Sequence, residues 1–189
     1  MPAQSSRAPT CNEERHDQGL LLDDSARRIN FSPKQTTVEA LRALTRPTSV
    51  SASSTRIAPA EYETFLIHVK LIAVTRTANF DTLVAVQGAT PGSTMVIVFP
   101  DTHMCLPNPG PHGGDIHSAT DGVYADCGPA IPFVHWVSLR GTAEIEGVGL
   151  WEPDDETSPK WSAPNKLTLH PALSFFSHGC AQPGALPFG

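Results

Sequence analysis

The segment YETFLIHVKLIAVTR, residues 62 to 76, constrains the fold of this chain more than any other stretch. Its apolar side chains occupy alternate positions and polar side chains lie between them: the apolar series is Phe65, Ile67, Val69, Leu71 and Ala73, and the polar series includes His68, Lys70 and Arg76. A period of two places the two series on opposite faces of an extended chain. The segment therefore predicts a long β-strand with one buried face.

Two shorter apolar runs follow this strand. Residues 83–86 and 94–99 are separated by GATPGS, residues 88–93, which is a turn signal. Three strands joined by short turns form an antiparallel meander. Further along, residues 133–139 fit either a short helix or a strand.

Two more strands are predicted near the end of the chain. Residues 142–151 form the fourth, in which Gly147 and Gly149 indicate a bulge or a sharp bend. Residues 166–173 form the fifth, and Pro171 is expected to limit further pairing.

The predicted order is three strands, a long connection and two more strands. A five-stranded Greek-key barrel of the oligonucleotide/oligosaccharide-binding (OB) type has this strand count and a variable element between its third and fourth strands. We therefore predict an all-β, OB-like barrel with a short N-terminal helix and a disordered N-terminal extension. A small β-sandwich is the alternative.

The predicted boundaries divide the chain into four parts. They are a disordered extension over 1–35, a short helix and linker over 36–56, the OB-like barrel over 57–176 and a loose tail over 177–189. The helix is placed at TTVEALRAL, residues 36–44, because apolar residues recur there at helical spacing, and Pro47 ends it.

Several stretches, among them STMVIVFPD and LTLHPAL, resemble a family of small, mostly uncharacterised bacterial proteins. The resemblance covers about residues 36–176 and implies an OB-like or nuclease-like barrel, without a function. The chain departs from the family pattern at Thr82, where the family often has histidine. It also departs after the third strand, where a loop rich in Pro, Gly and His replaces an Ala-rich helix.

That loop, residues 101–127, concentrates potential metal ligands: His103, Cys105, His112, His117 and Cys127. Cysteine and histidine are the ligands that zinc prefers, so a zinc site is the first interpretation, but this spacing matches no standard zinc module and no cofactor is predicted. A disulfide between Cys105 and Cys127 is a second interpretation and would contribute roughly 3 kcal/mol in an oxidising compartment. A plain surface insertion is the third.

Binding residues are expected on the barrel face and its loops. Trp161 is the best candidate for an exposed aromatic side chain, and it lies between Lys160 and Lys166. Arg76 and Arg140 could add positive charge. His170 is either a ligand-binding residue or a structural residue that fixes the barrel's closure. These residues lead us to predict a noncatalytic binding or interaction module of unknown ligand.

The competing class is a metal-dependent phosphodiester hydrolase. Such chemistry needs carboxylates to hold a cation and arginines to neutralise phosphate, and the candidates are Asp81 and Asp101 with Arg76 and Arg140. Convergence of these side chains on one barrel face would favour the enzyme. Turn aspartates that cap strand ends are the commoner explanation.

Charge and hydropathy restrict partners and location. Charged residues make up only 17% of the chain and the net charge is -6, which argues against duplex nucleic acid as the partner. No apolar stretch approaches the ~18 residues of a membrane span. Acidic residues lie where the apolar core of an export signal would be, so a cytoplasmic location is expected, although the family resemblance allows export.

Overall fold

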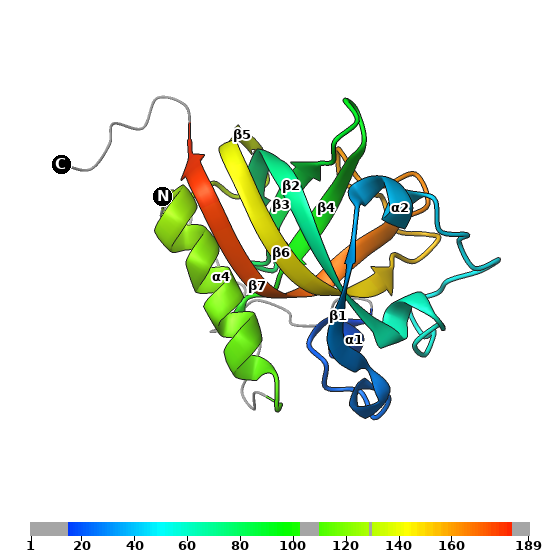
Figure 1. Ribbon diagram of the computed structural model, residues 1–189. Helices are drawn as coiled ribbons and strands as arrows, with labels where there is room; N and C mark the ends of the chain where they lie inside the picture. Colours follow the sequence, from blue (N-terminus) through cyan, green and yellow to red (C-terminus); the bar gives the residue numbers. More distant parts are fainter. Residues whose placement is uncertain (1–14, 103–109, 129, 183–189) are drawn as a thin grey trace, which may run out of the picture.

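A computed structural model describes residues 15–102, 110–128 and 130–182. Its centre is a closed β-barrel of five strands, with few short helices around it (Figure 1). The barrel strands are β2 (Glu63–Arg76), β3 (Thr82–Gln87), β4 (Thr94–Phe99), β6 (Arg140–Trp151) and β7 (Leu167–Ala181). The prediction of a mostly β protein built on a five-stranded barrel is confirmed.

Pairing around the barrel follows the order β2, β3, β4, β7, β6, and a second pairing of β2 with β6 closes it. All the contacts are antiparallel except the one between β4 and β7, where Ile97 lies opposite Leu169 in a parallel pair. The long strand β2 holds the barrel together, because its apolar series points into the main core, as in Ile67 and Leu71. A minimal strand, β5 (Val137–Ser138), pairs with the end of β2.

Glycines let β6 bend where the sequence predicts it. The register between β6 and β7 shifts on both sides of Gly147, which confirms the predicted bulge. A Cβ atom at Gly149 would lie 2.5 Å from the carbonyl oxygen of Ala60, so only glycine allows this close approach. Ala60 belongs to the short 3-10 helix η2 (Ala60–Tyr62) at the start of β2.

The connection after β4 contains a helix, α4 (Gly113–Cys127), where a loop is predicted. The expectation of a loop is wrong for these residues. Ile116, Ala119 and Val123 recur at helical spacing and are buried, and α4 packs along β7 (Figure 1). The surrounding Gly, Asp and His residues obscure this short apolar stripe in the sequence.

Residues 15–35 contain regular structure, which corrects the predicted disordered extension over this range. The N-terminal segment forms α1 (His16–Gly19), η1 (Ala26–Arg28) and β1 (Asn30–Thr36), which pairs in parallel with β2. Two ion pairs attach it to the domain: a buried pair of Arg15 and Glu61 at 2.6 Å, and a partly buried pair of Arg56 and Asp23 at 2.7 Å. These contacts join residues that are far apart in the sequence, so no local periodicity predicts them.

The short helix predicted near residue 40 is present as α2 (Val38–Arg42). The side-chain oxygen of Thr37 accepts a hydrogen bond from the Ala40 amide at 3.2 Å and caps it. Its buried side chains, Val38 and Leu41, join the main core.

The fifth strand runs past Pro171 to Ala181, so neither the predicted end of the strand nor the loose tail from residue 177 onward is correct over this range. The structure also corrects the predicted Cys105–Cys127 bond. Cys127, at the end of α4, forms a disulfide with Cys180 near the end of β7. Cys105 lies outside the described residues. Over the described ranges, the helices are too short or too polar to cross a membrane.

Candidate functional site

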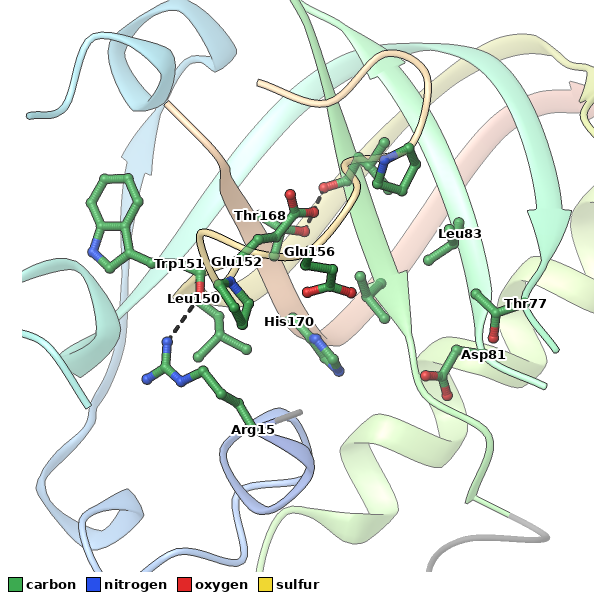
Figure 2. Close-up of a pocket in the computed structure, with 14 residues that line it drawn as sticks. Arg15, Thr77, Asp81, Leu83, Leu150, Trp151, Glu152, Glu156, Thr168 and His170 are labelled. Atoms are coloured by element: carbon green, nitrogen blue, oxygen red, sulfur yellow. Dashed lines mark hydrogen bonds between the residues drawn. The ribbon is translucent and has the colours of Figure 1, made fainter. Parts of the chain in front are cut away.

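A pocket on the outer face of the barrel, here called the outer pocket, lies under the loop of residues 152–166 that joins β6 to β7 (Figure 2). Alternate side chains of β3 and β4, such as Val84 and Ile97, belong to the main core. The side chains between them form a separate apolar cluster outside the barrel, made of Leu83, Val96 and Val98. The barrel residues that line the pocket are Leu83, Val96, Val98, Leu150, Trp151, Thr168 and His170. The pocket therefore has an apolar floor made by β3 and β4.

Two loops and the N-terminal segment complete the walls. The loop between β2 and β3 contributes Thr77 and Asp81, at one side of the pocket in Figure 2. The β6–β7 loop contributes Glu152, Pro153, Glu156 and Pro159, and the N-terminal segment contributes Arg15. The enclosed volume is about 110 Å³, which suits one small chemical group.

The β6–β7 loop is fixed at its base by Lys166. The Lys166 ammonium donates hydrogen bonds of 3.0, 3.1 and 2.8 Å to the carbonyl oxygens of Pro153, Asp154 and Glu156. All three of its N–H groups are thereby used within the loop. Lys166 is predicted to bind a ligand. In the structure its ammonium group holds the loop that forms the pocket wall.

A second clamp holds the same loop from outside. Arg46 donates to the Asp154 carboxylate at 2.7 Å and to the Glu152 carbonyl oxygen at 2.7 Å. The hydrogen bond from Arg46 to the Asp154 carboxylate, together with one from the Val50 amide, holds the pKa of Asp154 below its usual value. The start of the loop, residues 152–156, is therefore bonded by both Lys166 and Arg46.

Glu152 is a pocket carboxylate whose environment disfavours its ionised form. Burial under the loop raises the pKa of Glu152, and a 2.9 Å hydrogen bond from the Ser158 hydroxyl opposes that rise. More distant Lys166 and Arg46 also act against it. Burial is the largest effect, so the pocket disfavours the negative charge that Glu152 carries in water.

The positive charge of Arg15 is already neutralised at the pocket wall. Its guanidinium makes two hydrogen bonds of 2.6 Å to the Glu61 carboxylate, and the two side chains are 1% and 0% exposed. A further bond of 2.9 Å goes to the Trp151 carbonyl oxygen (Figure 2). Arg15 and Glu61 thus form a closed pair that adds no net charge.

Two buried polar atoms of the lining residues have no hydrogen-bond partner within the part of the chain that the structure describes. They are the Thr77 hydroxyl oxygen and Arg15 Nε. Buried polar groups are normally paired, so each such atom needs an explanation. Both atoms belong to residues that line the outer pocket, where a polar ligand could pair with them.

His170 lies in the outer pocket, with its ring packed on α1. A Cβ atom at Gly19 would lie 2.5 Å from His170 Nε2, so the ring contacts the bare backbone of that residue. His170 therefore both lines the pocket, where it could contact a ligand, and makes a structural contact with α1.

Trp161 and Lys160 lie beside the pocket. The Trp161 ring meets Trp136 edge to face at 4.9 Å, and the Lys160 ammonium lies 4.3 Å from the Trp161 ring centre. Trp136 packs on the apolar cluster of β3 and β4. Trp161 is half-buried, so the predicted exposed aromatic is instead one of a pair that covers part of the outer face.

The two predicted arginines are separate. Arg76, at the end of β2, stacks over Phe133 at 4.2 Å and lies 3.8 Å from the Asp101 carboxylate. Asp81 accepts a 2.8 Å hydrogen bond from the Asp101 amide, so both aspartates and Arg76 do meet at the ends of β2 and β4. Arg140 starts β6 opposite the end of β7 and is exposed.

The five predicted metal ligands do not form a described site. His103 and Cys105 lie outside the described residues, and Cys127 is consumed by its disulfide. His112 stacks on Phe31 at 3.8 Å, and His117 lies 3.2 Å from Asp121 on the next turn of α4. Among the described residues, no group of three or more His, Cys, Asp or Glu side chains could hold a metal ion.

No family model, curated protein or solved structure matches this chain. The functional argument therefore rests on the geometry and chemistry of the outer pocket.

Sequence reasoning missed Thr77, Glu152 and Glu156 as lining residues. The only signal was the acidic start of the loop EPDDETSPKWSAPN, and nothing local shows that this loop folds over β3 and β4.

Proposed function

We propose that the protein is a noncatalytic binding module of the OB type and that its ligand occupies the outer pocket. In OB barrels, ligands bind on the face of the second and third strands, between the loop that follows the first strand and the loop that precedes the fifth. The corresponding elements here are β3, β4, the β2–β3 loop and the β6–β7 loop. All four line the outer pocket, and this is the observation that carries the proposal.

The strand order supports the same assignment. Counting only the barrel strands, the order is first, second, third, fifth, fourth, with closure onto the first and a helix between the third and fourth. The pocket, at about 110 Å³, is smaller than the ~300 Å³ or more that drug-sized ligands occupy. It would therefore hold a small molecule or one terminal group of a longer ligand.

A methyl-labelled sample tests this proposal. A library of small polar fragments would be screened by NMR, and hits should shift the methyl signals of Leu83, Val96 and Val98. The variant Val96→Phe should abolish those shifts because the larger side chain fills the pocket, whereas Val134→Phe, on an exposed loop, should leave them unchanged. Hits that shift only signals elsewhere on the barrel would refute the location.

The phosphodiester hydrolase is the second candidate, supported by the meeting of Asp81, Asp101 and Arg76. Against it, an Asp81 carboxylate oxygen is used to accept the Asp101 amide, and Arg76 is packed against Phe133. Hydrolysis of a bis(nitrophenyl) phosphate with Mg²⁺, Mn²⁺ or Zn²⁺ would be compared for the wild type and Asp81→Asn. A binding module predicts no turnover in either; turnover that is lost in Asp81→Asn would establish the enzyme.

We also infer that the protein works in an oxidising compartment. The support is the Cys127–Cys180 disulfide, because such bonds persist in oxidising compartments and are rare in the cytosol. This inference replaces the cytoplasmic location expected from the N-terminal sequence.

A further inference from the structure

The apolar floor of the outer pocket continues into two tryptophans at its rim, Trp136 and Trp161, here called the Trp pair. Trp136 packs against the apolar cluster of β3 and β4 that makes the floor, and its ring meets the Trp161 ring edge to face, with the ring centres 4.9 Å apart. Trp161 lies in a turn closed by a 3.2 Å hydrogen bond from the Ser162 amide to the carbonyl oxygen of Pro159, which lines the pocket. Both tryptophans stay partly exposed. The pocket and the Trp pair therefore present one apolar surface to a ligand.

The backbone at Trp161 is strained. Its φ of 71° lies in the left-handed region, which bulky residues rarely adopt. Such a conformation persists only where the surroundings over-determine it, and it occurs most often at ligand-binding and active sites. Here the loop is held by the Lys166 ammonium, so the fold keeps the Trp161 ring beside Trp136 in spite of the strain. This observation is independent of the shape of the pocket, and it indicates a functional role for the Trp161 ring.

The lining of the outer pocket disfavours a charged ligand. Arg15 is the only permanently cationic side chain among the described lining residues, and Glu61 compensates its charge at a distance of 2.6 Å. Burial raises the pKa of Glu152, and the same desolvation would act on an ionised ligand group placed beside it. An anionic group would also be repelled by the carboxyl groups of the lining, Asp81, Glu152 and Glu156. A neutral ligand therefore fits the pocket better than an anion.

The residues of the pocket also include a buried hydrogen-bond donor. Arg15 Nε has no partner within the described part of the chain, and the Arg15 side chain, which belongs to the lining, is 1% exposed. A hydroxyl oxygen can accept from such a donor, and its O–H can donate to a carboxylate. The volume of about 110 Å³ holds one small group, so a larger ring would remain at the rim, against the Trp pair. A ring that carries hydroxyl groups and has an apolar C–H face meets these conditions.

We propose that the outer pocket and the Trp pair bind the pyranose ring of a neutral sugar. The C–H face of the ring packs against Trp161, and its hydroxymethyl group enters the pocket. The Lys160 ammonium, 4.3 Å from the centre of the Trp161 ring, supplies a donor for a sugar hydroxyl at the rim. This inference rests on the proposed binding function and names the class of its ligand.

Matched sugars test the proposal at pH 7. The probes are the methyl pyranosides of glucose, galactose and mannose, each with the pentoside that lacks the hydroxymethyl group and the uronide that has a carboxylate in its place. Binding would be followed by NMR, through the methyl signals of Leu83, Val96 and Val98 and the indole N–H signal of Trp161. At least one hexopyranoside should shift all of these signals. Its pentoside should bind roughly tenfold more weakly, because a hydrogen bond and a buried CH₂ group are lost, and its uronide should bind at least about tenfold more weakly because it is charged.

Matched variants identify the groups responsible. Trp161→Ala should weaken the hexopyranoside roughly tenfold because the ring contact is lost, and Trp161→Phe should recover part of that loss. Val96→Phe fills the pocket and should reduce the affinity for the hexopyranoside to that for the pentoside. Phe176→Ala, which removes a 62% exposed ring of β7 outside the pocket lining, is the control and should have no effect. The melting temperature of each variant shows that it is folded.

The outcomes separate this inference from the proposed function. Shifts of the pocket methyls by library fragments but by none of the hexopyranosides would overturn the sugar proposal and leave the outer pocket as a binding site. A uronide that binds as tightly as its hexopyranoside, or an unchanged affinity in a folded Trp161→Ala variant, would also overturn it. If neither the sugars nor the library fragments shift those methyls, both the sugar ligand and the pocket's binding role are refuted.

Discussion

At the scale of single residues, the outer pocket contains polar groups whose surroundings are unfavourable to them. Glu152 is a carboxylate in a place that disfavours its charge, and Thr77 has a hydroxyl without a described partner. By contrast, Glu61 is fully satisfied, because beyond Arg15 it accepts the Ile57 and Trp151 amides at 2.7 and 2.8 Å. Unsatisfied groups at the pocket beside satisfied ones behind it are typical of a binding site supported by a rigid wall.

Replacing Glu152 should change the pH dependence of stability. Its pKa is raised in the folded protein, so the folded state binds a proton more tightly than the unfolded state, and stability falls as pH rises from about 4 through the folded pKa. Glu152→Gln removes this loss. Urea unfolding should show the variant gaining stability relative to wild type at pH 7 and little or nothing at pH 4. A gain of the same size at both pH values would mean that charge burial is not the cause.

Gly19 tests the contact between α1 and His170. Gly19→Ala places a methyl group 2.5 Å from His170 Nε2, so the ring or the helix must move, at a cost of about 1–3 kcal/mol in unfolding free energy. Gly114→Ala in α4 is the control, because nothing lies within 4 Å of its Cβ position. It should leave stability unchanged or raise it by up to about 1 kcal/mol. Equal effects of the two changes would place His170 away from α1.

At the scale of elements, prediction succeeds where the pattern is local. The strand β2 is read directly from its alternation, and the β3–β4 hairpin from GATPGS between two apolar runs. The helix α4 is missed because its buried residues, Ile116, Ala119 and Val123, are dispersed among Gly, Asp and His. The segment before β1 is missed because its order depends on ion pairs to residues more than thirty positions away.

The site follows the same rule. His170 is predicted as a candidate and does line the outer pocket, because it belongs to a strand whose alternation is visible. Lys166 is predicted as a ligand-binding residue, and its three bonds to carbonyl oxygens, which depend on how the loop folds back, could not be predicted from the sequence. A loop's tertiary contacts have no periodicity, so the pocket itself could not be predicted.

Lys166→Met separates a structural role from a ligand-binding role. The variant keeps much of the aliphatic stem and loses three hydrogen bonds to the loop backbone, so unfolding free energy should fall by about 2 kcal/mol. Amide hydrogen exchange should also speed up within residues 152–166. Lys160→Met, whose ammonium only covers the Trp161 ring, should change stability by about 0.5 kcal/mol or less. Unchanged exchange in the Lys166 variant would contradict the clamp.

At the scale of the whole molecule, the closed barrel is fastened at two places, one beside the outer pocket and one at the end of β7. The N-terminal segment is held by Arg15 and Arg56, and the C-terminal end of β7 is held to α4 by the disulfide. Each attachment joins residues more than thirty positions apart in the sequence. Neither attachment covers the β3 and β4 side chains that form the floor of the outer pocket.

The Cys127–Cys180 bond should contribute measurably to stability. It closes a loop with a sequence separation of 53, for which the entropy of the unfolded chain predicts about 4 kcal/mol. A variant carrying Cys127→Ala and Cys180→Ala should therefore unfold at a lower urea concentration, and its free energy of unfolding should be lower by about 4 kcal/mol. Thiol alkylation of the protein in cells tests the compartment at the same time, because both sulfurs should resist labelling until a reductant is added. Rapid labelling of both sulfurs in cells without added reductant would indicate a reducing compartment and contradict the inference.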